Sequence, residues 1–204
     1  GSICELQIPR FKNDGTLEQD IRLFSASIHS NNWVINDAEC DYDKSFYYLK
    51  SNDKNKDDIF FLALPSDIKS RKINKLLPFS EYTKTVPDYR ANLCVKNMTG
   101  GFSSYQSEYP FGMISKKGSL ISSVFTLLNS DAMDNLVLIK NIFHKPIKES
   151  YPAYLVSKEK KLILKEFEIF TNTSNVITLS NEDISEENYI IADGYLGIPI
   201  YFSE

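Results

Sequence analysis

The chain has 204 residues, of which 42% are hydrophobic and 25% charged, and its 23 basic and 27 acidic side chains give a net charge of -4. A chain of this length can bury about 70% of its unfolded surface without disulfides or metal. These values exclude a disordered chain, and we expect a single globular domain over residues 1–204. With no long basic run, nucleic acid is disfavoured as the main partner.

The three cysteines, Cys4, Cys40 and Cys94, are too widely spaced for a CxxC pair or a disulfide framework. We therefore expect three reduced thiols that bind no metal, in a reducing compartment such as the cytoplasm. No stretch approaches the roughly 20 apolar residues of a membrane span, and no secretory leader opens the chain. Gly1-Ser2 resembles the scar of a cleaved tag, which leaves a removed leader or N-terminal domain open.

The first elements combine one strand with one helix. Residues 3–8 alternate polar and apolar side chains, which predicts a half-buried strand ending at Pro9. Residues 16–19 have the form of a capping box, and the apolar spacing after them predicts a helix over 17–30. A strand over 21–35 is the alternative.

Four carboxylates stand at alternate positions directly after this segment: Asp37, Glu39, Asp41 and Asp43. On one strand they would line one face, which suggests either a calcium site or a solvated acidic edge. A helix-loop-helix calcium loop counted from Asp37 needs Gly and a carboxylate where Tyr42 and Tyr48 stand, so we favour the acidic edge.

Two aromatic runs, 45–50 (SFYYLK) and 59–64 (IFFLAL), flank a polar octet, and we expect them to form a hairpin. Ser66-Asp67 predicts the N-terminus of a short helix that ends near Leu77, before Pro78. A linker is expected over 79–88.

The stretch 89–128 is expected to supply the middle of a sheet, as three extended segments joined by two glycine-marked reversals. The first reversal contains Gly100-Gly101, and the second is a hairpin loop at Lys116-Lys117-Gly118 between the runs 111–114 and 120–128. The run 120–128 also fits an amphipathic helix, and we favour the strand.

Beyond this stretch, strands are predicted over 136–143, 153–157, 162–170 and 176–179, and a last hairpin is predicted with its turn at Asp193-Gly194. Strands outnumber helices throughout. We predict a mainly β fold, an antiparallel β-sandwich of jelly-roll type with one or two short helices. An α+β fold is the alternative.

The familiar catalytic signatures are absent from the sequence. It contains no GxSxG, Walker, GxGxxG or HExxH motif, and its only histidines, His29 and His144, have no ligand partners at local spacing. We therefore expect no cofactor and no metal, and we expect both histidines to be surface or structural residues.

The region richest in binding groups is the expected loop 100–110, which offers three aromatic rings, hydroxyls, an amide and a carboxylate. The candidate ligand-binding residues are Arg90, Ser103, Ser104, Tyr105, Gln106, Glu108 and Tyr109. In the alternative interpretation, the aromatic residues pack the core and the serines cap turns.

Two function classes follow from these residues. The first is a non-catalytic module that recognises a glycan, a peptide or a protein partner through this loop, and we favour it because no nucleophile stands paired with a base. The second is a hydrolase or transferase acting on a glycan or ester, with Glu108, Asp37, Glu39 or Asp41 as acid or base. The sequence leaves the oligomeric state open.

Overall fold

The computed structural model describes residues 2–10, 20–50, 57–76, 91–98, 102–106, 117–140, 142–195 and 198–204. The fold is mainly β, as predicted, and all of its described strand pairs are antiparallel. The chain divides into two compact units, Gly1–Phe111 and Gly112–Glu204. The described residues include no helix long and apolar enough to cross a membrane.

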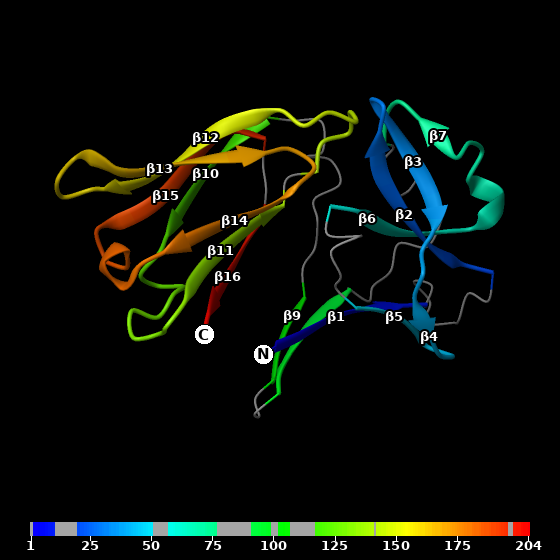
Figure 1. Ribbon diagram of the computed structural model, residues 1–204, viewed down its shortest axis with the longest axis horizontal. Coiled ribbons are helices and arrows are strands. Elements are labelled where there is room, and N and C mark those ends of the chain that lie inside the picture. The colour runs from blue at the N-terminus through cyan, green and yellow to red at the C-terminus, as the bar shows by residue number, and fades with distance from the viewer. Residues whose placement is uncertain are drawn as a thin grey trace. The chain divides into compact units, whose positions relative to one another are not determined.

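The strands of the first unit form two sheets, shown in Figure 1. The five-stranded sheet has the order β4-β5-β1-β8-β9, and the four-stranded sheet has the order β6-β2-β3-β7. Their bounds are β1 Ser2–Pro9, β2 Arg22–His29, β3 Asn32–Asp37, β4 Asp41–Tyr42, β5 Phe46–Lys50, β6 Ile59–Ala63, β7 Lys72–Ile73, β8 Asn92–Asn97 and β9 Phe102–Gln106.

One apolar cluster joins these two sheets. Ile8, Tyr47 and Leu49 come from the five-stranded sheet, and Leu23 and Leu62 come from the four-stranded sheet. Burying these side chains removes apolar surface from water, at about 25 cal/mol per Å². The strand pair β1 and β5 therefore has one face on the core and one face away from it.

The predicted helix over 17–30 is wrong for the described residues from 20 onward, which instead begin a β-hairpin. Strand β2 pairs with β3 through a turn at Ser30 and Asn31, whose φ angles are +47° and +58°. Both faces of β2 are buried, with Leu23 in the shared core and Phe24 stacked on the Phe61 ring. A strand buried on both faces loses its alternation, which explains the helical spacing of its apolar residues.

The predicted hairpin between 45–50 and 59–64 is also wrong, although both strands exist. Strand β5 pairs with β1 and β4, and strand β6 pairs with β2 in the other sheet. The predicted helix after Ser66 is a single 3-10 turn, η1 Pro65–Asp67, followed by the short strand β7. The expected linker over 79–88 lies outside the described residues.

The second unit also contains two sheets, with orders β10-β15-β12-β13 and β14-β11-β16. Their bounds are β10 Lys117–Ser123, β11 Asn135–Lys140, β12 Ser150–Ser157, β13 Leu162–Phe170, β14 Ser174–Leu179, β15 Asn188–Tyr195 and β16 Ile198–Ser203, with the 3-10 turn η4 Asn181–Asp183 before β15.

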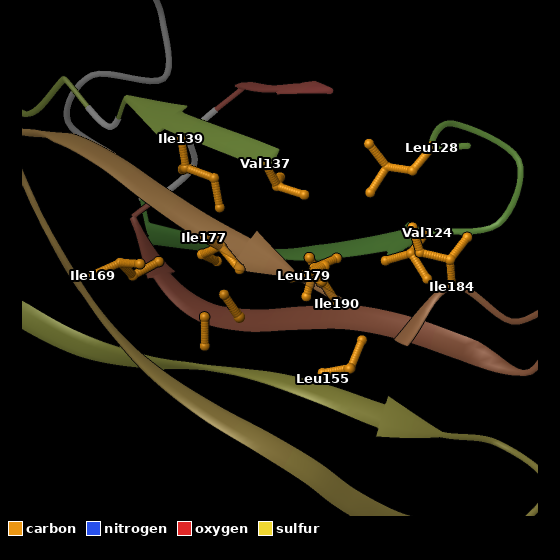
Figure 2. Close-up of a cluster of buried hydrophobic side chains, with 12 residues drawn as sticks. Val124, Leu128, Val137, Ile139, Leu155, Ile169, Ile177, Leu179, Ile184 and Ile190 are labelled. Atoms are coloured by element: carbon orange, nitrogen blue, oxygen red, sulfur yellow. The ribbon is translucent and has the colours of Figure 1, made fainter. Parts of the chain in front are cut away.

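Figure 2 shows the core of this unit, where side chains from both sheets point toward one another. Val137 and Ile177 come from the three-stranded sheet, and Leu155 and Ile190 come from the four-stranded sheet; none is more than 2% exposed. The regular alternation of β11 and β14, buried at every second residue, made these strands predictable from sequence.

Two glycines of this unit that were predicted to lie in turns belong to strands instead. Lys117 and Gly118 begin β10, and Gly118 lies opposite Gly194 of β15, so neither glycine is in a turn. The closing hairpin is wrong as well, because β15 and β16 belong to different sheets. Strand β10 ends at Ser123, and the Leu128 N–H donates to the Val124 carbonyl at 3.0 Å, so the end of the run 120–128 is a helical turn.

Candidate functional site

The candidate site lies on the five-stranded sheet of the first unit, on the face away from the apolar core. The strand register places one residue from each strand in a continuous line across this face. That line is Asp41, Tyr48, Gln7, Asn92 and position 106. A second line beside it is Lys50, Glu5, Cys94 and position 104. We call the face that carries both lines the polar face.

The opposite face carries the apolar neighbours of these residues. Leu49 lies opposite Leu6, Leu6 lies opposite Leu93, and Leu93 lies opposite position 105. Leu49 is buried in the core cluster and Leu6 packs against it. Because successive residues of a strand point to opposite faces, these side chains separate the core from the polar face.

Tyr48 is held in a defined orientation on the polar face. Its hydroxyl donates to Oδ2 of Asp43 at 2.7 Å, and its ring centroid lies 6.2 Å from that of Phe46. The hydrogen bond to Asp43 is the main cause that raises the pKa of Tyr48, and the charge of Glu5 adds to it. The phenol therefore stays protonated at neutral pH and remains a donor to Asp43.

Asp43 organises the turn between β4 and β5. Its Oδ1 accepts the backbone N–H groups of Ser45 at 2.7 Å and Phe46 at 2.8 Å. The Tyr48 hydroxyl, followed by these two N–H groups, lowers the pKa of the Asp43 carboxyl. The carboxylate is thus fixed as an anion that supports Tyr48.

Arg10 closes the same turn from the other side of the sheet. Its Nη1 donates to the Asp43 carbonyl at 2.7 Å, and its guanidinium lies 5.5 Å and 5.0 Å from the ring centroids of Tyr42 and Tyr47. Such cation-π contacts add roughly 0.5–2 kcal/mol each. The turn that orients Tyr48 is therefore held from both sides.

Amide and carboxylate groups surround Tyr48. Nε2 of Gln7 donates to Oε1 of Glu5 at 3.1 Å, and Nζ of Lys50 lies 3.7 Å from Oδ2 of Asp41. The ion pair is largely exposed, so it contributes little to stability. These groups can be recruited by a polar ligand at small cost to the fold.

Asn92 has an unsatisfied acceptor in the middle of this face. Its Nδ2 donates to Sγ of the buried Cys94 at 3.3 Å, but its Oδ1 is buried and has no hydrogen-bond partner among the residues that the structure describes. A buried polar atom without a partner costs about 1–3 kcal/mol. A donor from a ligand or a bound water would recover this free energy.

The predicted site residues fall into three groups. Residues 103–106 belong to strand β9, where a loop was expected. The backbone of positions 104 and 106 pairs with Cys94 and Asn92 of β8, and that of positions 103 and 105 pairs with Val95 and Leu93. Arg90, Glu108 and Tyr109 lie outside the described residues.

The four alternating carboxylates do not line one strand. Asp37 ends β3 in the four-stranded sheet and lies 3.1 Å from Nη2 of Arg71, whereas Asp41 is in β4 of the other sheet. Across the ranges that the structure describes, no three His, Cys, Asp or Glu side chains come close enough to share a metal ion. All four carboxylates are exposed, as the acidic-edge interpretation expects, but they do not form one edge, because Asp37 and Asp41 lie in different sheets.

The remaining candidates lie apart from the polar face. His29 is exposed at the end of β2, and the His144 ring packs 4.4 Å from the Phe143 ring in the second unit. Cys4, Cys40 and Cys94 form no disulfide, and burial, followed by the charge of Asp41, raises the pKa of Cys40. A raised pKa keeps that thiol protonated and poorly nucleophilic.

Sequence reasoning missed Tyr48, Gln7, Glu5 and Asn92. The alternation within residues 3–8 and 45–50 indicated that each strand has a polar face. What it could not give was the pairing of β5 with β1 and of β1 with β8, which creates the line across the sheet.

Comparisons with protein-family models, with curated proteins and with solved structures found no match to this chain.

Proposed function

We propose that the first unit is a non-catalytic binding module that recognises a neutral glycan on its polar face. The main support is the buried Oδ1 of Asn92, for which the described part of the chain supplies no hydrogen-bond donor, one residue along the same line from Gln7 and two from Tyr48. A sugar hydroxyl is both a donor and an acceptor, so it suits this oxygen and the neighbouring amide of Gln7.

The aromatic groups support a glycan in particular. The ring of Tyr48 is fixed by Asp43 and lies beside Phe46. An ordered ring is a good platform for the apolar face of a sugar, because little side-chain entropy is lost on binding.

The charges on this face favour a neutral ligand over an acidic one. Glu5, Asp41 and Asp43 surround Tyr48, and the basic Lys50 is already paired with Asp41. Carboxylates accept hydrogen bonds from hydroxyl groups, whereas an anionic ligand would meet like charges.

The second candidate, a carboxylate-dependent hydrolase or transferase, has less support. A general acid needs a raised pKa, but the Asp43 pKa is lowered by its three donors. Asp37 and Asp41 lie in different sheets and each has a cationic partner. Glu108 lies outside the described residues.

A glycan array probed with the labelled protein tests the proposal, followed by calorimetric titration of the best neutral glycan. Tyr48→Ala should weaken binding about tenfold or more, as loss of an aromatic anchor does. Tyr48→Phe keeps the ring but loses the hydrogen bond to Asp43, so its effect should be smaller.

Tyr42→Ala is the matched control, because Tyr42 is 69% exposed on the neighbouring strand but lies on the opposite face, beside Tyr47. It should leave glycan affinity unchanged. Binding that survives Tyr48→Ala, or an array on which the protein binds no neutral glycan, would reject the glycan proposal.

A further inference from the structure

The polar face is exposed at one end and buried at the other. Along its second line, Lys50 of β5 is exposed, Glu5 of β1 is half-buried, and Cys94 of β8 is only 2% exposed. Burial on this line therefore increases from β5 to β8.

The first line changes in the same direction. The Asp41 side chain is 80% exposed, Tyr48 and Gln7 are half-buried, and Oδ1 of Asn92 is buried. Because the two lines agree, the face is open over β4 and β5 and closes at Asn92 and Cys94.

Along the strands, the face opens again but its chemistry changes. Ile3, which is 45% exposed, lies opposite the exposed Lys96 of β8. This pair offers neither an aromatic ring nor an amide to a neutral sugar. The groups that suit such a sugar run across the strands, from Asn92 over Gln7 to Tyr48.

The sheet sets the spacing of these groups. Neighbouring strands lie about 4.8 Å apart, so Gln7 is one step and Tyr48 two steps, or about 10 Å, from Asn92. One step is close to the length of one pyranose unit in an extended glycan. Three consecutive sugars therefore fit over the three strands β8, β1 and β5.

We propose that the polar face binds the end of a linear neutral oligosaccharide. The terminal sugar donates a hydroxyl group to Oδ1 of Asn92, the second sugar lies over Gln7, and the third stacks on the Tyr48 ring. The chain then leaves over β4. This inference rests on the glycan recognition proposed above and adds which part of the glycan is bound.

The closed end selects a chain terminus over an internal segment. An internal sugar carries a linkage on both sides, and at Asn92 one of the two would extend into the closed end beside the buried Cys94. A terminal sugar carries its linkage on one side only. Its remaining hydroxyl groups include the donor that the described part of the chain does not supply to the Asn92 oxygen.

Calorimetric titration with linear oligosaccharides of glucose, mannose, xylose and galactose, each from monosaccharide to hexasaccharide, tests the proposal. For the sugar that binds, the trisaccharide should bind about tenfold or more tightly than the disaccharide, because it adds the contact with an aromatic anchor. Affinity should stay constant for longer chains. A long soluble polymer of the same sugar should bind one protein per chain.

Two variants locate the sugars on the face. Tyr48→Ala should cancel the gain of the trisaccharide and leave the affinity for the disaccharide unchanged, whereas Asn92→Ala should weaken binding at every length. Ile3→Ala is the matched control, because Ile3 is exposed on the same face outside the path of the chain, and it should change no affinity. Circular dichroism should show that every variant is folded.

The outcomes separate this inference from the proposed function. A polymer that binds many proteins per chain, or a Tyr48→Ala variant that weakens disaccharide and trisaccharide equally, would overturn end recognition while glycan binding stands. Absence of binding to every oligosaccharide and to the neutral glycans of the array would overturn both.

Discussion

The two units use the same architecture but expose opposite surface chemistry. In each unit, an antiparallel sheet covers an apolar core with one face. The outer face of the sheet in the first unit carries Tyr48, Gln7 and Asn92, whereas that of the second unit carries Ile121, Ile191 and Tyr154. The fold alone therefore does not define what a sheet face can bind. The residues at alternate positions of its strands define it.

The two units also differ in the hydrogen bonding of a buried asparagine side chain. In the second unit, Asn175 donates to the carbonyls of Ile139, Phe170 and Thr173 and accepts the Phe170 N–H. In the first unit, the Asn92 oxygen has no partner among the described residues. The first amide is fully used in structural hydrogen bonds, whereas the second keeps a free acceptor within the described residues.

The largest expected effect is on the free energy of unfolding, and it compares a residue of the inner face with a residue of the outer face in the second unit. Leu155→Ala removes a side chain that is fully buried, and should lower the free energy of unfolding by about 3–4 kcal/mol. Ile121→Ala, on the outer face, should change it by less than about 1 kcal/mol. Urea unfolding followed by circular dichroism measures both, and equal losses would contradict the described faces.

The next effect compares the two asparagines. Asn175→Ala breaks a satisfied network and should cost about 2–3 kcal/mol in the same urea experiment. Asn92→Ala removes an unsatisfied oxygen and one weak contact with sulfur, and should be nearly neutral without ligand. A large loss for Asn92→Ala would show that this side chain is structural.

A smaller effect concerns acid sensitivity in the second unit. Burial alone would raise the pKa of Asp183, but the Lys165 ammonium and the Ser180 donors outweigh it and lower that pKa. A lowered pKa stabilises the fold above the unfolded value of about 3.9, and this stabilisation is lost as pH falls through the folded value.

Lys165→Met should therefore destabilise the chain by about 1 kcal/mol at pH 7 and reduce the loss of stability between about pH 5 and pH 2. Melting temperatures across this range measure the change. The exposed pair Lys50 and Asp41 in the first unit is the control, and Lys50→Met should leave the pH profile unchanged. An unchanged profile for Lys165→Met would contradict the assignment.

The sequence predicted the strands better than their partners. Alternation and turn residues are local, so β1, β13 and β14 were found close to their true bounds. Pairing is not local: SFYYLK pairs with the first strand, and Gly118 lies opposite Gly194 near the other end of the chain. Each glycine was interpreted as a turn because the strand opposite it was unknown.

The candidate site could not be predicted for the same reason. Positions 104 and 106 were in the predicted set, and their backbone pairs with Cys94 and Asn92 of β8. Tyr48, Gln7 and Asn92 were not in that set, because their proximity depends on two non-local strand pairs, β1 with β5 and β1 with β8. A polar residue on a strand becomes a candidate only when its neighbours across the sheet are known.

Chemical-shift mapping by NMR tests the central claim most directly, with the best neutral glycan from the array titrated into labelled protein. We predict shifts concentrated at Glu5, Gln7, Tyr48 and Asn92, with the outer face of the second unit, such as Ile121 and Ile191, unaffected. Shifts centred on that outer face, or their absence at Tyr48 and Asn92 under saturating glycan, would contradict a binding site on the polar face.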